Sequence, residues 1–261
     1  MLDPLEVRVD SHVAWVRFGD PAQHNLLTVP LLEALPEALS EAESRHSRVV
    51  VLRGRGDVWS AGYDVAQIPP QIFSDDPETV AAHAFERCMR AVGDCRLVTI
   101  AAIRGAAFGG ALELAASCDL RITHEDARLG LPPAKLGIVY SHTGLQKLLG
   151  LLGGANTRML VFTGCPVGAR EAERIGLVNR AVAGHQFDAV VEKLARDVAA
   201  CAPLAVQGMK QVLRIVERGT PVSETDVRTI LRLRNEAYRS EDFQEGQNAF
   251  TEKRKPRFRG R

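Results

Sequence analysis

The fold of this chain is decided by the stretch Val98-Thr-Ile-Ala-Ala-Ile-Arg104-Gly105-Ala-Ala-Phe108-Gly109-Gly110-Ala-Leu-Glu113-Leu114. Its largely apolar run, Val98–Ile103, predicts a strand that is buried on both faces. The small residues after it lead into a predicted helix. Because glycine has no Cβ, this turn can bring backbone N–H groups close to a ligand. A helix that begins at Gly109–Gly110 would also point unpaired N–H groups, and the positive end of its dipole, at that ligand.

An earlier stretch has the same order of strand, small residues and helix. It reads Val49-Val-Val-Leu-Arg-Gly-Arg-Gly-Asp-Val-Trp59-Ser-Ala-Gly62-Tyr63-Asp64-Val65. Two backbone donors that converge on one oxygen form an oxyanion hole, which is often a large term in catalysis. Glycine-rich turns between strand and helix also serve tight packing in α/β proteins. Spacing alone therefore leaves both interpretations open.

Other common site motifs are missing from the sequence. The run Gly54-Arg-Gly56-Asp-Val-Trp59 lacks the third glycine of a dinucleotide-binding G-x-G-x-x-G. The phosphate-binding G-x-x-x-x-G-K-[ST], the hydrolase G-x-S-x-G and the zinc-binding H-E-x-x-H are absent as well. The histidines form no ligand pair with one another or with cysteines, so no metal site is predicted.

The remaining pattern predicts an α/β protein, because strands and helices alternate over the first half of the chain. Strands are expected at 7–9, 12–18, 49–52, 98–103 and 120–123, and helices at 29–45 and 77–92. After Gly144 only helices are expected, at 145–152, 156–162, 169–175, 187–201, 204–217, 223–238 and 243–253. We therefore expect a core domain over residues 1–200 and a helical C-terminal region over residues 201–261.

Composition indicates an ordinary globular protein. Of the 261 residues, 46% are hydrophobic and 25% charged, and a net charge of +1 gives no general reason to expect a polyanionic partner. Five scattered cysteines without a C-x-x-C pair indicate reduced thiols and a cytoplasmic location. The first ten residues lack the apolar region of a signal peptide. The most apolar stretch, Leu97–Ser117, is interrupted by Arg104 and Glu113, which argues against a membrane span.

Several ordered motifs together resemble the crotonase (enoyl-CoA hydratase/isomerase) superfamily over nearly the whole chain. They are Pro21–Leu27, Trp59–Val65, Ala107–Asp119, Lys135–Gly137 followed by Gly144, and Asn248–Lys255. The resemblance implies an α/β fold built as a spiral of ββα units, with a helical C-terminal trimerisation region. It also implies a homotrimer or a dimer of trimers that binds an acyl-CoA substrate. No cofactor is implied beyond the CoA moiety of that substrate.

The same resemblance assigns site residues. The oxyanion donors of the family correspond to the backbone N–H groups of Tyr63 and Gly110. The implied CoA-binding positions are Ala22, Gln23, His24, Ala61, Asp64, Val65 and Gly109, together with Phe250 and Lys253 reaching a neighbouring subunit's CoA.

Glu113 corresponds to the first of two glutamates that manage water in the hydratases of this family. The second glutamate corresponds to Pro133, which can neither donate nor accept a proton. Hydration by two carboxylates is therefore disfavoured. A glutamate in the first turn of a helix is also favoured by the helix dipole, whatever its function.

Tyr140 is the second candidate side chain. The run Gly137-Ile-Val-Tyr140 is similar to the Gly-Val-Pro-Tyr run of the methylmalonyl-CoA decarboxylase branch. That branch has a histidine where this chain has Tyr63, so only the backbone role carries over. The alternative for Tyr140 is a tyrosine packed on the rim of the site with its hydroxyl in water.

These residues predict an enzyme that processes an acyl-CoA through a thioester enolate, including decarboxylation of a methylmalonyl-CoA-like substrate. Glu113 would be the general acid or base, and Tyr140 would orient the substrate. The alternatives are an enoyl-CoA hydratase or isomerase that uses Glu113 alone, and a non-catalytic acyl-CoA-binding protein. Nucleic-acid binding through the basic residues of 253–261 is the minor alternative.

Overall fold

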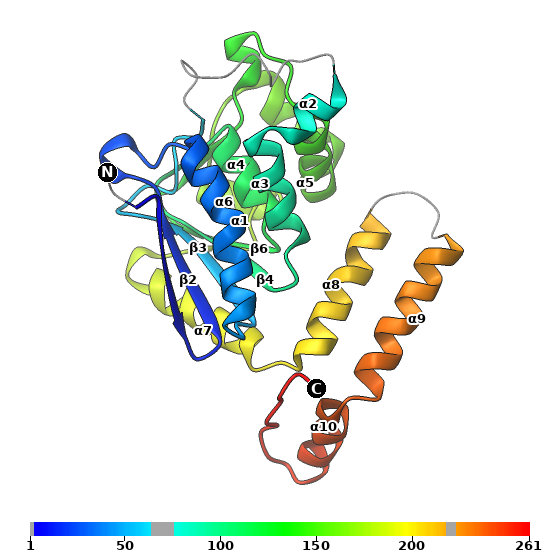
Figure 1. The fold of residues 1–261 in the computed structure, drawn as a ribbon. Helices are drawn as coiled ribbons and strands as arrows, with labels where there is room; N and C mark the ends of the chain where they lie inside the picture. The colour runs from blue at the N-terminus through cyan, green and yellow to red at the C-terminus, as the bar shows by residue number, and fades with distance from the viewer. Residues whose placement is uncertain (1–2, 64–75, 218–222) are drawn as a thin grey trace.

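The computed structural model describes residues 3–63, 76–217 and 223–261. Its centre is a six-stranded sheet with the order β1-β2-β3-β4-β6-β9 (Figure 1). β1 is antiparallel to β2, and each following pair is parallel. The strands are β1 (Leu5–Asp10), β2 (Val13–Phe18), β3 (Val49–Gly54), β4 (Val98–Ile103), β6 (Leu120–His124) and β9 (Arg180–Val182).

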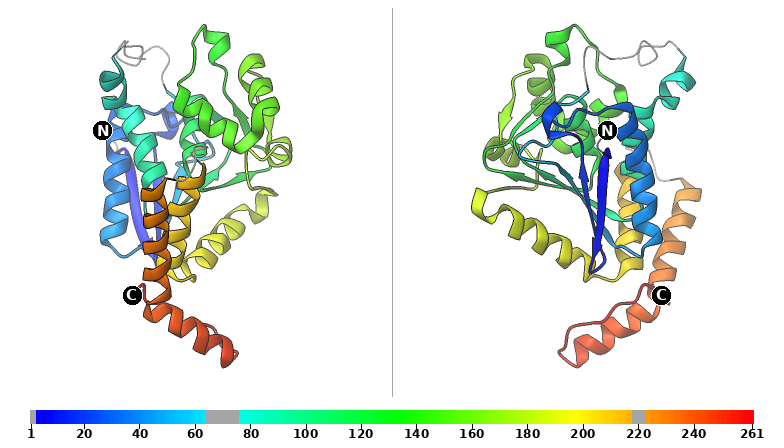
Figure 2. Two further views of the ribbon diagram at one scale, coloured as in Figure 1. Left: turned by 90° about the vertical axis from the view of Figure 1, so that its right-hand side faces the viewer. Right: turned by 60° about the vertical axis from the view of Figure 1, so that its left-hand side comes forward.

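Helices cover both faces of this sheet, as the two views of Figure 2 show. Successive side chains of a strand point to opposite faces. Val50 and Leu52 of β3 therefore join the core under α1, whereas Val49 and Val51 join the core under α7. The helices of this part are α1 (Val29–Ser44), α2 (Pro77–Ala82), α3 (Ala84–Asp94), α4 (Gly110–Ser117), α5 (His142–Thr163), α6 (Ala169–Arg174) and α7 (Phe187–Ala199). Among the described residues, short 3-10 turns occur at η1 (Pro21–Gln23), η4 (Pro133–Leu136) and η5 (Gly184–Gln186).

A second, three-stranded sheet was not predicted from the sequence. It consists of β5 (Ala106–Phe108), β7 (Arg128–Gly130) and β8 (Val167–Gly168). Strands of two or three residues are too short to show an alternating pattern. The expectation of helices alone after Gly144 is wrong for the same reason, because β8 and β9 lie there.

Two helix predictions also change in detail. The single helix expected over 77–92 is divided into α2 and α3 at His83, whose extended backbone and ring Nδ1 cap the start of α3 by accepting from Phe85 N–H. The helices expected at 145–152 and 156–162 form one element, α5, with a kink at Gly153 where φ is 67°.

The C-terminal helices form an arm that extends away from the sheet (Figure 1). They are α8 (Pro203–Glu217), α9 (Glu224–Tyr238) and α10 (Glu241–Thr251), close to the predicted bounds. α8 packs against α9 and is tied to the core by Lys210, whose Nζ lies 2.6 Å from Asp119 Oδ2 and 2.8 Å from Leu97 O. In the described part of the chain, no helix has the length and apolar character needed to cross a membrane.

Candidate active site

The two glycine turns singled out in the sequence lie against each other. Residues 59–60 run beside the segment that leads into α4, with Trp59 N–H donating to Arg104 O at 2.7 Å and Ser60 N–H to Ala106 O at 3.0 Å. Gly62 has φ of +97°, and a Cβ there would lie 2.4 Å from Phe108 O and 3.6 Å from Gly110 N. Glycine is therefore required at position 62, both by the backbone conformation and by the close approach. The turn that contains Gly62 and Tyr63 thus meets the start of α4.

Helix α4 begins at Gly110, after Gly109 with φ of +56°. The N–H groups of the first turn of a helix have no acceptor within the helix, so this end of α4 is suited to bind an oxygen. Phe85 covers Gly110 closely, because a Cβ on Gly110 would lie 2.8 Å from Phe85 Cε2. The ring of Tyr63 lies edge-on to Phe85 with centroids 6.3 Å apart. Tyr63 and Gly110 thus both lie beside the ring of Phe85.

Glu113 lies one turn into α4, where its side chain is only 2% exposed. Lys147 of α5 points at it, with Nζ 3.3 Å from Glu113 Oε1 and 2.8 Å from Ser117 Oγ. Burial raises the pKa of Glu113, and the positive charge of Lys147 acts against that rise. A carboxyl group whose pKa is raised is a better general acid at neutral pH than an exposed glutamate.

Tyr140 lies beside Glu113, and its hydroxyl is buried, not in water at a rim. Both side chains pack closely on Gly144, since a Cβ on Gly144 would lie 2.6 Å from Tyr140 Cε1 and 2.7 Å from Glu113 Oε2. In the described part of the chain, the Tyr140 hydroxyl and Glu113 Oε2 have no partner at hydrogen-bonding geometry. Burial raises the pKa of Tyr140, and the negative charge of Glu113 raises it further. The side chains of Tyr140 and Glu113 still interact in this buried place, and that interaction lowers the pKa of Glu113 and raises the pKa of Tyr140.

Sequence reasoning missed two charged residues of this site. Besides Lys147, Glu86 of α3 lies nearby, where its Oε2 accepts a hydrogen bond from Thr143 Oγ1 at 3.2 Å. The negative charge of Glu86 raises the pKa of both Glu113 and Tyr140. Lys147 could have been found, because helical spacing places it on the same face as Gly144. Glu86 reaches the site only through the packing of α3, for which the sequence gives no signal.

Most of the residues expected to bind CoA lie on an accessible edge beside the turn that contains Gly62. Ala22, Gln23, His24 and Ala61 are exposed, and Ala61 N–H donates to His24 O at 3.0 Å. Gly109 is partly exposed at the start of α4. The remaining two expected positions, Asp64 and Val65, lie outside the described residues.

Phe250 and Lys253 are not brought to this site within the chain. Phe250 lies at the end of α10 and Lys253 just after this helix, both on the arm, and the Phe250 side chain is almost fully exposed. Figure 1 shows α10 at the opposite end of the molecule from α4 and α5.

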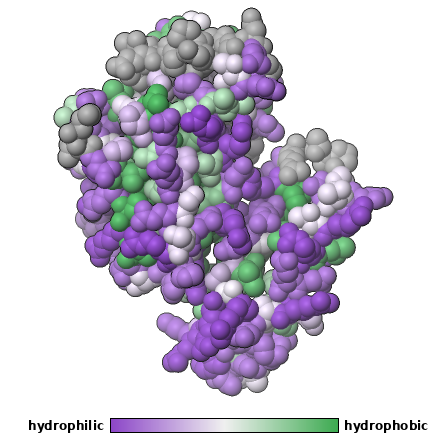
Figure 3. Space-filling view, in the orientation of Figure 1, coloured by the Kyte–Doolittle hydropathy of each residue, from purple (hydrophilic) through white to green (hydrophobic). Residues whose placement is uncertain are grey.

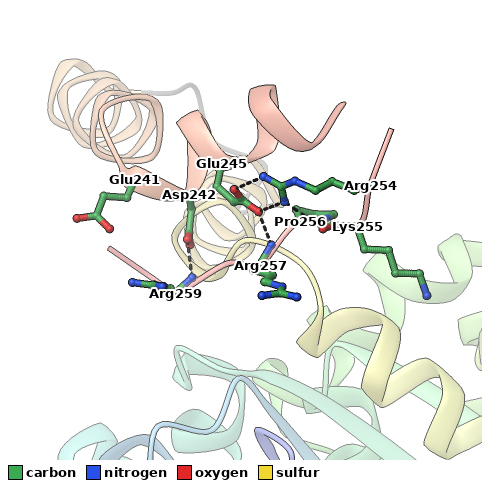
Figure 4. Close-up of a pocket in the computed structure, with 8 residues that line it drawn as sticks. All are labelled: Glu241, Asp242, Glu245, Arg254, Lys255, Pro256, Arg257 and Arg259. Carbon is green, nitrogen blue, oxygen red and sulfur yellow. Dashed lines mark hydrogen bonds and ion pairs between the residues drawn. The ribbon is translucent and has the colours of Figure 1, made fainter. Parts of the chain in front are cut away.

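The basic tail folds back onto α10 around a hollow of about 700 Å³ (Figure 4). Arg254 makes a two-pronged ion pair with Glu245, at 2.6 and 2.9 Å. Buried Asp242 accepts hydrogen bonds from the backbone N–H groups of Arg259 and Gly260. Part of the tail's positive charge is therefore neutralised within the chain.

No group of three or more His, Cys, Asp and Glu side chains that could hold a metal ion occurs among residues 3–63, 76–217 and 223–261. The groups described at the site are backbone N–H groups, the carboxyl groups of Glu113 and Glu86, the phenol of Tyr140 and the ammonium group of Lys147.

The two-sheet α/β core, the paired glycine turns and the helical arm together define the crotonase fold. A family model described as enoyl-CoA hydratase/isomerase matches residues 8–261, and the chain belongs to that family. It is 33% identical to a probable enoyl-CoA hydratase of Bacillus subtilis, over 99% of this chain and all of that one. It is 29% identical to the methylmalonyl-CoA decarboxylase of Escherichia coli, over 96% and 95% of the two chains. The crystal structure of an enoyl-CoA hydratase/carnitine racemase from Magnetospirillum magneticum superposes with a TM-score of 0.87 at 31% identity, covering all of this chain and 97% of that one.

Proposed function

We propose that this chain is an enzyme that processes an acyl-CoA through a thioester enolate. The observation that carries the proposal is the position of Glu113, buried one turn below the N-terminus of α4, where that helix meets the Gly62 turn. The thioester oxygen would accept hydrogen bonds from the N–H groups of Tyr63 and Gly110. Glu113 would transfer the proton, and Tyr140 would orient the reacting carbons. Backbone donors of this kind stabilise negative charge that develops on an acyl oxygen.

Decarboxylation of a methylmalonyl-CoA-like substrate is the reaction we favour. The C–CO₂ bond breaks, its electron pair becomes the enolate, and the α-carbon then takes one proton to give the product thioester. One proton-transfer group is enough for this sequence. Pro133, at the position of the second hydratase glutamate, is buried in η4 and offers no such group. The relative from Escherichia coli that bears this activity in its name supports the choice.

A one-glutamate hydratase or isomerase is the second candidate. The relatives named as hydratases support it. In this candidate Glu113 alone would transfer the proton to or from the substrate.

We propose further that the arm joins copies of the chain into a trimer or a dimer of trimers. The helices α8, α9 and α10 enclose an apolar groove of about 900 Å³, and apolar side chains are exposed along the arm in Figure 3. Met209, Leu213 and Tyr238 line this groove and are more than half exposed. A groove lined by exposed apolar side chains is typical of an interaction site. Phe250 and Lys253 would then contact CoA in a neighbouring subunit, consistent with their distance from their own site.

The test is incubation with methylmalonyl-CoA, a 3-enoyl-CoA and crotonyl-CoA, followed by mass analysis of the products, with Glu113→Gln as the matched control. We expect methylmalonyl-CoA to lose the mass of CO₂ with the wild type only. Efficient hydration of crotonyl-CoA would contradict the argument from Pro133. Binding of CoA without turnover of any thioester would show a non-catalytic binding protein instead.

A further inference from the structure

The two carboxylate oxygens of Glu113 have different surroundings. Oε1 lies 3.3 Å from the ammonium group of Lys147. Oε2 is buried against Gly144 and Tyr140, and among the described residues it has no partner at good hydrogen-bonding geometry. Oε1 is therefore held by Lys147, whereas Oε2 lacks a well-placed partner. A buried polar atom without a partner lowers the stability of the fold.

Lys147 is itself fixed relative to α4. Its Nζ donates to Ser117 Oγ at 2.8 Å, and that hydroxyl donates to the backbone carbonyl of Glu113 at 2.8 Å. Lysine, serine and glutamate thus form a closed ring of contacts between α4 and α5. The Lys147 side chain is 27% exposed, so its ammonium group keeps part of its hydration while it faces a carboxyl group that is 2% exposed.

The charges around Glu113 act in opposite directions. Glu86 on α3 is negative and Tyr140 is a neutral phenol at neutral pH, whereas Lys147 on α5 is positive. The thiol of Cys88 on α3 is near Lys147, but burial raises its pKa to about 12 and it carries no charge. Among the described groups that act on the Glu113 carboxyl group, Lys147 is therefore the cation that offsets burial and Glu86.

We propose that Lys147 is a positioning residue that holds Oε1 of Glu113 and thereby leaves Oε2 as the oxygen that exchanges the proton with the substrate. This inference rests on the proposed function, in which Glu113 transfers that proton. When the Oε2–H bond breaks and the new C–H bond forms, the electron pair stays on the carboxylate. The resulting negative charge appears 3.3 Å from the ammonium group, which stabilises it.

The experiment measures exchange of the α-protons of propionyl-CoA in D₂O as a function of pH, because this step needs Glu113 whatever the full reaction is. The variants are Lys147→Met, which keeps the length of the side chain without its charge, and Lys147→Arg, which restores the charge. Lys193→Met is the matched control, since Lys193 forms an exposed ion pair with Asp197 on α7, away from the site. Circular dichroism checks folding, and Lys147→Gln replaces the methionine variant if that variant does not fold.

The exchange rate should rise with pH as Glu113 loses its proton. We expect Lys147→Met to move this rise to higher pH, because the charge that favours the carboxylate is lost, and to lower the rate about tenfold at pH values within the rise. Lys147→Arg should recover most of the rate, and Lys193→Met should match the wild type. A pH profile of Lys147→Met that superimposes on the wild type, while Glu113→Gln is inactive, would overturn this inference alone. Exchange that survives in Glu113→Gln would instead overturn the proposed function.

Discussion

Gly62 lies so close to Phe108 that a Cβ on Gly62 would be 2.4 Å from the Phe108 carbonyl oxygen. This contact packs the turn that contains Gly62 and Tyr63 against the start of α4 through backbone atoms. The side chain that follows, Tyr63, can therefore differ from its counterpart in relatives without moving the turn. In the proposed mechanism the Gly62 turn contributes backbone geometry, whereas Glu113, Tyr140 and Lys147 contribute side-chain chemistry.

Substitution of Gly62 tests this geometry. We expect Gly62→Ala to lower α-proton exchange by about 10²-fold, the loss seen when one oxyanion donor is removed. Stability should also fall by roughly 1–3 kcal/mol, because φ is +97° and the added Cβ meets a backbone oxygen. Gly150→Ala is the control, since Gly150 is helical with open space around it, and it should be stabilising by about 0.5–1 kcal/mol. Full activity in Gly62→Ala would show that the close approach is irrelevant to the site.

Removal of the Glu113 carboxyl group should abolish chemistry and spare binding. We expect Glu113→Gln to lower turnover by about 10²- to 10⁴-fold. CoA affinity, measured by calorimetry, should not change. Weaker CoA binding together with the lost turnover would point to a structural role.

The same variant should change how stability depends on pH. Burial raises the pKa of Glu113 above its unfolded value, so its contribution to stability is fully present at low pH and is lost as pH rises through the folded pKa. Glutamine has no such loss. The difference in Tm between Glu113→Gln and the wild type should therefore be more positive at about pH 8 than at about pH 4. The change should be roughly 2–4 °C for each 1 kcal/mol of stability that the wild type loses between these two pH values. A difference in Tm that shrinks as the pH rises would contradict the raised pKa.

Loss of the Tyr140 hydroxyl should separate stability from activity. This buried hydroxyl has no partner at good hydrogen-bonding geometry among the described residues, so Tyr140→Phe should leave the Tm nearly unchanged. Turnover should fall by about tenfold, since a group aimed at the reacting atoms is lost. A lower Tm with unchanged turnover would assign the hydroxyl to the fold instead.

The ion pair between Lys210 and Asp119 should hold the arm to the core. Lys210 is 8% exposed, and its removal leaves Asp119 and the Leu97 carbonyl without this donor. We expect Lys210→Met to lower the free energy of unfolding by about 3 kcal/mol, measured by urea denaturation. Lys193→Met breaks an exposed pair and should cost at most about 0.5 kcal/mol. Equal losses in the two variants would contradict a special role for the buried pair.

The apolar groove of the arm should decide the oligomeric state. Leu213 is 58% exposed and lines this groove, so an aspartate there would place a charge in the proposed interface. We expect Leu213→Asp to be monomeric by light scattering and to bind CoA more weakly, while Lys193→Glu on α7 keeps the assembly. An unchanged mass for Leu213→Asp would contradict an interface at this groove.

The sequence predicted features that depend on nearby residues. The apolar residues of Val98–Ile103 predicted a buried strand, and the glycines before Glu113 predicted the start of a helix, because each signal lies in the local order of residues. Glu86 could not be assigned in the same way, and the helical spacing of Lys147 from Gly144 does not by itself show that Lys147 faces Glu113. They reach Glu113 only because α3 and α5 pack on α4, a tertiary arrangement that no local pattern encodes. The break at His83 and the short strands β5 and β8 were missed because each involves too few residues to form a pattern.

The central claim is that backbone N–H groups of the two turns stabilise a thioester enolate. Acetoacetyl-CoA tests it most directly, because its enolate absorbs in the ultraviolet at longer wavelength than its keto form. We predict that, at neutral pH, binding to the wild type raises the enolate fraction above that of the free thioester. Binding to Gly62→Ala should not raise it. Bound acetoacetyl-CoA that keeps the spectrum of the keto form on the wild type would contradict the account.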